Sequence, residues 1–499
     1  MPDLPHPTAS PAYRTAADPK LGLLIPLVVA CALFMENLDS TIIATSIPEI
    51  ARSLDESPLH LNLAVTSYLL SLAVFIPISG WVADRFGARN VFCGAIVLFT
   101  LGSALCGLST SLPMMIATRI LQGLGGAMMT PVGRLILLRS FPKEALVQAM
   151  TYMTIPALIG PTMGPIVGGF LTTYVSWRWI FYINIPIGLA GIALALRFID
   201  NIEMPRPPRF DFTGFVICGI ALAATELVLE SVGRALVPAW VEATLAVTAV
   251  VALALYRRHA RRTPNPAVDL GVFRLRSFSL STLAGGLCRV GLNTVPFLLP
   301  LQLQLGFGMS AMQSGAITFV SSLGAIVLKS ASTWVLRRFG FRRLLVGNGV
   351  LSGLVIAGIA SFTPATPHAL IYLYLLVYGF MRSMQFTCVN TLAYADVPAD
   401  MMSRATGVAS VAQQMSMSFG VALGATLLGL LVGPGGTVTA APFHYVYPMV
   451  AGLPMVASLF FLRLKPTDGM QVSGYRPRAV IEAQSASAAP ATSSTAPAP

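Results

Sequence analysis

Two acidic residues, Glu36 and Asp39, lie in one apolar run of the chain, and a basic residue, Arg119, lies in another. A charge at the centre of a membrane costs roughly 2.5–3.5 kcal/mol, so such residues are candidates for function. Residues three apart share one face of a helix. Two carboxylates in a low-dielectric environment cannot both ionise at low cost, so the pair is predicted to carry a proton, with Arg119 as its counter-charge. The alternative for Asp39 is a structural role, as a partner of Arg119 or as a helix cap.

Other polar residues also interrupt apolar runs. Arg289 and Arg382 are predicted either to contact an anionic group of a ligand or to pair with polar neighbours such as Gln385 and Asn390. Amide side chains both donate and accept hydrogen bonds, so glutamines are further candidates to line a cavity. The glutamines in question are Gln302, Gln304, Gln413 and Gln414.

The composition places these residues in a membrane protein. Hydrophobic residues make up 55% of the 499 residues and charged residues 10%, against about 25% charged in soluble domains. So little charge cannot cover a water-soluble surface, which excludes a soluble enzyme. The six cysteines lie in apolar runs without a CxxC pair, which argues against a disulfide framework and a metal site. The predicted fold class is therefore an all-α polytopic membrane protein.

Fourteen apolar runs are long enough to cross a bilayer, which takes a helix of about 20 residues. With the N-terminus in the cytoplasm, 24 of the 32 Lys and Arg residues fall in cytoplasmic segments and three in loops on the other side. This asymmetry follows the positive-inside rule and predicts that both termini are cytoplasmic. Glu226 and Glu230, one turn apart toward the outer end of the seventh run, are expected at the membrane–water interface. The runs begin near Leu21, Leu61, Asn90, Leu112, Ala149, Trp179, Phe212, Ala239, Phe278, Ala311, Leu344, Ala369, Ala405 and Tyr445.

The chain also contains an internal repeat. The segment Gly80–Arg89 reappears 253 residues later as Thr333–Arg342, and Gly164 and Gly168 correspond to Gly420 and Gly424. Spans 1–6 therefore resemble spans 9–14. Two six-helix halves are typical of a transporter whose substrate path runs between them.

The repeat suggests a division of the chain into five parts. The last part is rich in Ala, Ser, Thr and Pro, so it cannot bury a core and is expected to be disordered. The predicted parts are a cytoplasmic tail (1–20), a six-helix bundle (21–200), two inserted helices with a basic cytoplasmic linker (201–277), a second six-helix bundle (278–464) and a disordered cytoplasmic tail (465–499).

Two glycine-containing motifs are candidates for moving parts. In the first, Asp84 can meet a helix N-terminus or an arginine in one conformation and release it in another, unless the motif is only a solvated basic loop. In the second, glycines at four-residue spacing let another helix approach closely and Pro165 favours a kink, unless this is ordinary packing. The first motif comprises Gly80, Asp84, Arg85, Gly87 and Arg89, and the second Gly160, Pro161, Gly164, Pro165, Gly168 and Gly169.

These motifs resemble those of the major facilitator superfamily, from about Leu21 to Leu464. The glycine motifs are similar to its motif A and its antiporter motif C, and the arginine in Arg119–Gly123 is similar to the motif B arginine that is linked to proton transfer. Fourteen spans resemble the drug:proton antiporter branch, which contains EmrB/QacA-like multidrug exporters. Two further matching segments are Leu38–Ala44 and Trp177–Pro186.

The resemblance implies a secondary active transporter rather than an enzyme. It would export small amphipathic compounds in exchange for protons by alternating access, from a bacterial inner (plasma) membrane, with the proton gradient as energy source and with no cofactor, metal or nucleic acid. A periplasmic adaptor and an outer-membrane channel are candidate partners. The alternative is a proton-coupled exporter of one metabolite, siderophore or amino-acid-like compound, with a symporter less favoured. We expect Asp39→Asn to abolish proton-coupled efflux while expression and folding stay intact.

Overall fold

The long apolar runs form α-helices, because a helix satisfies its backbone hydrogen-bonding groups internally, as a lipid environment requires. The computed structural model describes residues 19–141, 143–201, 209–231, 238–398, 401–433, 436–465 and 467–470. In these ranges every regular element is helical, and twelve helices are long and apolar enough to cross a membrane. The all-α membrane class is therefore confirmed. Nearly all of the two predicted tails lies outside the described residues.

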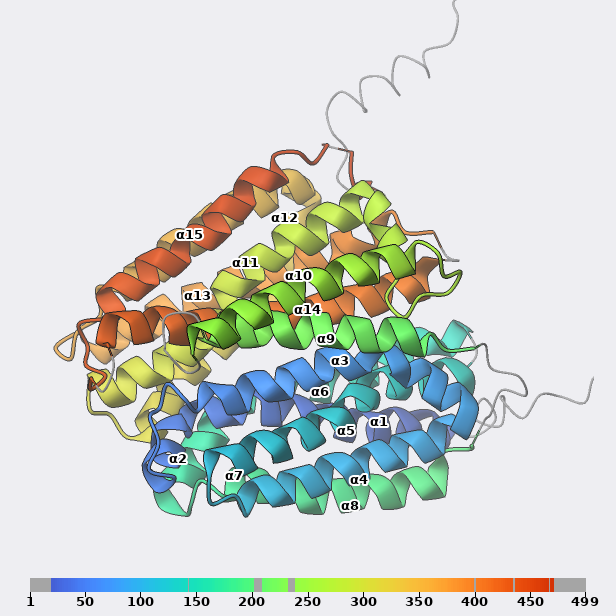
Figure 1. The fold of residues 1–499 in the computed structure, drawn as a ribbon, viewed down its shortest axis with the longest axis horizontal. Helices are drawn as coiled ribbons and strands as arrows, with labels where there is room; N and C mark the ends of the chain where they lie inside the picture. Colours follow the sequence, from blue (N-terminus) through green and yellow to red (C-terminus); the bar gives the residue numbers. More distant parts are fainter. Residues whose placement is uncertain are drawn as a thin grey trace, which may run out of the picture.

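The first part of the chain folds into a helical bundle, which forms the lower half of the molecule in Figure 1. A 3₁₀ turn, Ile43–Thr45, follows α1. The helix α6 begins at Lys143, earlier than the predicted start near Ala149. The helices are α1 (Pro19–Ile42), α2 (Ile47–Ser53), α3 (Asn62–Phe86), α4 (Ala88–Gly107), α5 (Leu112–Ser140), α6 (Lys143–Tyr174), α7 (Trp179–Tyr182) and α8 (Asn184–Phe198).

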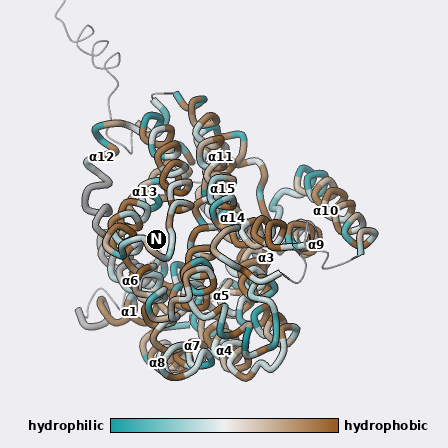
Figure 2. The backbone as a smooth tube through the Cα atoms, turned by 90° about the vertical axis from the view of Figure 1, so that its left-hand side faces the viewer, coloured by the Kyte–Doolittle hydropathy of each residue, from teal (hydrophilic) through white to brown (hydrophobic). Residues whose placement is uncertain are grey.

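Two helices follow between the halves in sequence, α9 (Phe212–Ser231) and α10 (Ala239–Ala260). The two helices pack on each other, and α9 also packs on α3 of the first bundle and on α14 of the second. Figure 2 shows α10 at the periphery, with α9 between it and the body of the molecule. The inserted pair therefore lies over one line of contact between the two bundles.

The second bundle contains one helix that is too long to cross a membrane once. The helix α12 runs over 49 residues, from Ala311 to Ile359, which corresponds to about 74 Å at 1.5 Å per residue. Its helical geometry is broken at Gly340, where φ is 70° and ψ is 166°. The predicted loop between the tenth and eleventh spans is thus a single glycine. The helices of this bundle are α11 (Arg276–Leu301), α12 (Ala311–Ile359), α13 (His368–Ala395), α14 (Met402–Val432) and α15 (Phe443–Phe461).

The positive φ of Gly340 has a counterpart in the first bundle. Gly87, 253 residues earlier, has a φ of 85° and separates α3 from α4. Residues with a side chain rarely adopt this conformation, so both sites favour glycine. The glycine that the internal repeat places in each half therefore has a positive φ in both halves.

The glycine spacing of the repeat also has the same packing role in both halves. A Cβ atom at Gly168 would lie 2.5 Å from the carbonyl oxygen of Ile42 on α1. A Cβ atom at Gly424 would lie 2.7 Å from Cγ2 of Thr294 on α11. Because no side chain intervenes, α6 approaches α1 closely and α14 approaches α11 in the same way.

The two bundles meet along two helix pairs, α6 with α12 and α3 with α14. Near the end of α1, Nε2 of Gln304 donates a hydrogen bond to the carbonyl oxygen of Thr45 over 2.9 Å. The backbone amide of Met312 donates to Oγ1 of Thr173 over 3.0 Å. Both contacts lie at the end of the molecule where α1 and α6 end and α12 begins. The bundles are therefore held together at that end.

Candidate functional site

A buried ion pair joins α1 to α5. The guanidinium of Arg119 donates from Nη1 to Oδ2 of Asp39 over 2.5 Å, and the two side chains are 1% and 0% exposed. The Arg119 guanidinium also lies over the rings of Tyr68 and Phe181, at 5.2 and 5.0 Å from their centroids. Aromatic faces attract a cation most strongly where water is excluded. The structure therefore brings together the acid and the counter-charge that the sequence predicts.

Glycines on α5 allow this approach. Arg119 and Gln122, one turn apart, face α1, while the next glycines face α3 and α4. A Cβ atom at Gly123 would lie 2.8 Å from the carbonyl oxygen of Tyr68, and one at Gly125 would lie 2.5 Å from the amide nitrogen of Phe99. The segment Arg119–Gly126 thus combines polar residues for the site with glycines that seat α5 against its neighbours.

Two amide side chains complete the coordination of Asp39. Gln122 donates from Nε2 to Oδ1 of Asp39 over 2.9 Å, and Asn184 donates from Nδ2 to the same oxygen over 3.2 Å. Gln122 also accepts from Arg119, and Asn184 donates to Ser103. Neither amide is predicted as a site residue, although both lie in segments that carry the family resemblance. Charge alone could not identify them, because both are neutral.

Glu36 has different surroundings from Asp39. Its Oε2 accepts a hydrogen bond from Oγ1 of Thr130 over 2.7 Å, and the residue is half-buried, whereas Asp39 is 1% exposed. Thr130 lies on α5, three helical turns after Arg119. The two acids therefore contact the same helix at different levels, and Glu36 is the more accessible of the two.

The residues of motif A connect the ends of several helices of the first bundle. Asp84 on α3 forms an ion pair with Arg139 near the end of α5, which is the partnership with an arginine predicted for it. Gly87 makes the turn to α4, and the Arg89 guanidinium donates to the carbonyl oxygen of Ile199 over 3.5 Å. Gly80 and Arg85 are exposed. Motif A thus joins α3, α4 and α5 to the segment that follows α8.

The glycines of motif C face two different partners. Those at Gly160, Gly164 and Gly168 face α1. Gly169 instead faces the second bundle, where its Cβ would lie 2.5 Å from the carbonyl oxygen of Ala311 and 3.0 Å from Cα of Met312. On the facing helix, a Cβ atom at Gly315 would collide with the carbonyl oxygen of Pro165. Motif C is therefore also a direct backbone contact between the halves.

The second bundle holds two arginines that share an aromatic ring. Arg289, 6% exposed, donates to Oδ1 of Asn390, as one of its two predicted roles requires. Arg382 donates to Oδ1 of Asn293 over 3.3 Å rather than to Gln385. Both guanidiniums lie over Phe386, at 5.7 and 5.3 Å from its centroid. The pair is thus a concentration of positive charge within the second bundle.

The predicted amide lining does not form one cluster. Gln385 is buried against Asn348, whose Nδ2 donates to it over 2.8 Å. Gln302 is buried, Gln304 bonds to Thr45 at the end of α1, and Gln413 is exposed. Gln414 is half-buried. These residues therefore lie in different surroundings, and their side-chain contacts do not bring them together.

The expectation for Glu226 and Glu230 is wrong. Both residues are 2% exposed and buried between helices, so neither side chain faces a membrane–water interface. The sequence places them on an inserted helix, but it does not reveal that this helix packs against both bundles.

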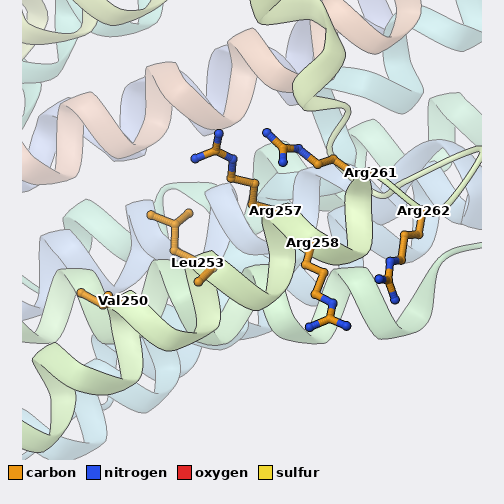
Figure 3. Close-up of a pocket in the computed structure, with 7 residues that line it drawn as sticks. Val250, Leu253, Arg257, Arg258, Arg261 and Arg262 are labelled. Atoms are coloured by element: carbon orange, nitrogen blue, oxygen red, sulfur yellow. The ribbon is translucent and has the colours of Figure 1, made fainter.

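A shallow pocket lies on α10, outside both bundles. Apolar residues Val250, Leu253 and Ala254 line it together with four arginines. Figure 3 shows Arg257 and Arg261 pointing to one side of the helix and Arg258 and Arg262 to the other. All four arginines are exposed. The pocket is therefore a basic end of a peripheral helix, not a cavity between the halves.

Comparison with known proteins settles the family. The Major Facilitator Superfamily model matches residues 29–421. The chain is 38% identical over 448 residues to "Putative multidrug resistance protein MdtD" of Salmonella heidelberg, across 89% of this chain and 95% of that protein. This chain belongs to the Major Facilitator Superfamily. A protein of the same name from Escherichia fergusonii is 39% identical over 451 residues, with the same coverage. This Major Facilitator Superfamily protein is therefore a multi-pass transporter of a bacterial inner membrane and not an enzyme.

Solved structures show the same fold at low sequence identity. A D-xylose–proton symporter superposes with a TM-score of 0.65 at 17% identity, covering 89% of this chain and 98% of that one. A peptide transporter in complex with sulfate superposes with a TM-score of 0.66 at 13% identity, covering 90% and 95%. These likenesses concern the fold of the Major Facilitator Superfamily alone.

Proposed function

We propose that this transporter exports small amphipathic compounds in exchange for protons, by alternating access between its two bundles. The names of the relatives from Salmonella heidelberg and Escherichia fergusonii refer to multidrug resistance. The observation that carries the proposal is the buried pair of Asp39 and Arg119. A buried ion pair is weak evidence for stability, because its desolvation cost can exceed its Coulomb energy. A charged pair inside a membrane is therefore better explained by function.

The chain crosses the membrane fourteen times in this proposal. Besides the twelve spans already described, α6 is 32 residues long, and Ala311–Ile326 forms a further apolar stretch at the start of α12. A bilayer core is about 30 Å thick, so the roughly 74 Å of α12 suits two crossings that meet at Gly340. Fourteen crossings put both ends of the chain on one side.

The arginine cluster of α10 gives the orientation. Positively charged residues accumulate on the cytoplasmic side of membrane proteins. The exposed residues Arg257, Arg258, Arg261 and Arg262 at the end of α10 therefore mark that side (Figure 3). In this orientation α1 begins at the cytoplasmic side and ends at the outer side. The contacts of Gln304 with Thr45 and of Met312 with Thr173 then lie at the outer side, and in this proposal they make the conformation inward-facing.

The proton site is formed by Glu36, Asp39 and Arg119 in this proposal. In the inward-facing conformation Asp39 neutralises Arg119, and protonating Asp39 would leave a buried cation without its counter-charge, which is unfavourable. Proton uptake at Asp39 therefore belongs to the outward-facing conformation, after the pair has separated. Glu36, half-buried and bonded to Thr130, exchanges its proton on the cytoplasmic side. Substrate binds from the cytoplasm while Asp39 is ionised.

The two glycine motifs set the balance between conformations. Asp84 and Arg139 hold the cytoplasmic ends of α3 and α5 together as one unit. At the outer side, Gly169 and Gly315 allow α6 and α12 to touch through their backbones. Such backbone contacts have two discrete arrangements, packed or separated, which alternating access requires. Motif C is thus the outer gate in this proposal.

Arg289 and Arg382 favour a second candidate function. The described residues give each of them an amide oxygen as partner, not a carboxylate. A substrate with a carboxylate would supply the missing negative charge. This supports the alternative of a proton-coupled exporter of one metabolite, siderophore or amino-acid-like compound, with Asn390 beside Arg289 contributing a polar contact. The proton gradient is the proposed energy source in both cases, without a cofactor. A periplasmic adaptor and an outer-membrane channel stay predicted partners.

A transport assay with the purified chain in proteoliposomes tests the proposal. The panel contains cationic dyes, neutral amphiphiles and small carboxylates, each measured with and without an imposed pH gradient. We expect the dyes and amphiphiles to move against the direction of proton flow, only when the gradient is present, and a protonophore to stop them. Movement of carboxylates alone would favour the second candidate. Transport that is the same with and without the gradient would rule out proton coupling.

A further inference from the structure

The inserted helix α9 is bonded to both halves of the transporter. Nδ2 of Asn62 on α3 donates to both carboxyl oxygens of Glu230, over 2.8 and 2.6 Å. On the other side, Oγ1 of Thr426 on α14 donates to the carbonyl oxygen of Leu229 over 3.1 Å. Figures 1 and 2 both show α9 beside α3 and α14. Because the halves must move relative to each other during transport, some contacts of α9 have to change in every cycle.

Glu226 occupies the centre of this junction. Its Oε1 accepts a hydrogen bond from Oγ of Ser418 on α14 over 2.7 Å. Oγ of Ser418 also lies 3.4 Å from the carbonyl oxygen of Thr66 on α3. Glu226 is 2% exposed, and none of the described residues gives its Oε2 a hydrogen bond. One serine hydroxyl thus stands between a buried carboxyl group on the inserted helix and the backbone of the other half.

The charged groups around Glu226 do not include a neutralising partner among the described residues. The described charged group that acts on Glu226 is Glu230, one turn further along α9, and it has the same sign. The other titratable or charged residues on α9 and on the helices packed against it are Cys218 on α9, Tyr68, Asp84 and Arg85 on α3, Arg404 on α14, and Glu242, Tyr256, Arg257, Arg258 and His259 on α10. Arg404 is paired with Asp269.

We propose that Glu226 is a second proton-binding site of this transporter, at which a bound proton links α3 to α14 through Ser418. An ionised carboxylate with an oxygen unpartnered among the described residues is unfavourable at a position that is only 2% exposed, so the closed junction favours the protonated acid. Separation of α3 from α14 admits water and allows the acid to ionise. The inference rests on the proposed proton coupling, but concerns residues distinct from Asp39 and Glu36.

The proton changes the direction of the hydrogen bonds. In the ionised state, the single hydroxyl hydrogen of Ser418 is donated to Oε1 of Glu226. In the protonated state, the carboxyl hydrogen of Glu226 is donated to Oγ of Ser418, and the serine hydrogen is free to be donated to the carbonyl oxygen of Thr66. One added proton therefore gives one more hydrogen bond between the halves. Protonation from the outer side would close the junction and promote the return to the inward-facing conformation.

Distances between spin labels test this proposal without any substrate. The labels are attached at Thr110→Cys and Ala365→Cys, exposed positions at the outer ends of the two halves, in a chain whose six native cysteines have been replaced. We expect a shift from mildly alkaline to mildly acidic pH to move the distance distribution toward its short component. Glu226→Gln mimics the neutral acid and still donates to Ser418. It should therefore keep the short component at every pH.

Two further variants make the result specific. Ser418→Ala removes the link to Thr66 and should abolish the acid-induced shift. Glu242→Gln, which removes a carboxylate of the inserted pair away from the junction, should leave the shift unchanged. A full pH response in Glu226→Gln would overturn the proposal, and loss of that response in Asp39→Asn instead would assign it to the α1 site. The label distances are measured without cargo. A failure of proton-coupled transport in proteoliposomes would therefore count against the proposed function, and not against the role of Glu226.

Discussion

The change Asp39→Asn is expected to reduce proton-coupled efflux to background and to destabilise the protein. The loss of transport follows because an amide cannot carry the exchanged proton. The loss of stability follows because Arg119 stays buried without its counter-charge, which costs about 3–5 kcal/mol. This expectation replaces the one made from the sequence, in which folding stays intact. Dye efflux from proteoliposomes and thermal unfolding in detergent measure the two effects separately.

The double change Asp39→Asn with Arg119→Gln separates structure from coupling. It removes both charges, so most of the lost stability should return, while proton coupling should stay absent. If the pair were only structural, the double variant would regain coupled transport together with stability. Glu49→Gln is the matched control, because it breaks an exposed ion pair with Arg52 in the segment that follows α1. Exposed pairs contribute about 0–1 kcal/mol, so neither transport nor stability should change measurably.

The change Gly169→Ala is expected to open the outer contact between the halves. Its Cβ would lie 2.5 Å from the carbonyl oxygen of Ala311 and 3.0 Å from Cα of Met312, and backbone atoms cannot move aside as a side chain can. Overpacking of this kind costs about 1–3 kcal/mol, which corresponds to a shift of roughly 5- to 150-fold away from the closed arrangement. Efflux should fall accordingly. The rate at which a membrane-impermeant maleimide labels a single cysteine introduced by Gln304→Cys should rise.

The neighbouring glycine is the control for this prediction. Gly168→Ala creates a clash as close, 2.5 Å from the carbonyl oxygen of Ile42, but within the first bundle. It should lower thermal stability without increasing labelling at the outer side. At both positions alanine has a helix propensity about 1 kcal/mol more favourable than that of glycine. Any loss of stability or efflux in these variants must therefore come from packing. Equal labelling in both variants would contradict the assignment of Gly169 to the contact between halves.

Much of the fold follows from the sequence, because helix length and apolar periodicity are local properties. The starts at Leu112, Trp179, Phe212 and Ala239 agree with the structure. The described residues of α12 form no loop where the sequence predicts one after the tenth span. The arginines of this segment are good helix formers and continue the helix, and Gly340 alone makes the turn. The internal repeat predicts a turn at this glycine, because Gly340 corresponds to Gly87, which makes the turn between α3 and α4.

The site is predictable only in part. The pairing of Asp39 with Arg119 could be anticipated, because two opposite charges in apolar runs have few other partners. The amides of Gln122 and Asn184 could not, because their role depends on how α5 and α8 pack around α1. Glu226 was assigned to the wrong environment for the same reason. Its burial depends on where α9 lies between the bundles, which hydrophobic periodicity does not specify.

The most direct test of the central claim measures protons and cargo on the same protein. The purified transporter is placed in weakly buffered detergent solution, and a transported cationic dye is added while the pH is recorded. If the acids on α1 exchange protons for cargo, the unmodified chain releases protons when the dye binds, and the triple variant Glu36→Gln, Asp39→Asn and Arg119→Gln, which lacks both acids, releases far fewer. Equal proton release from both proteins would contradict the account.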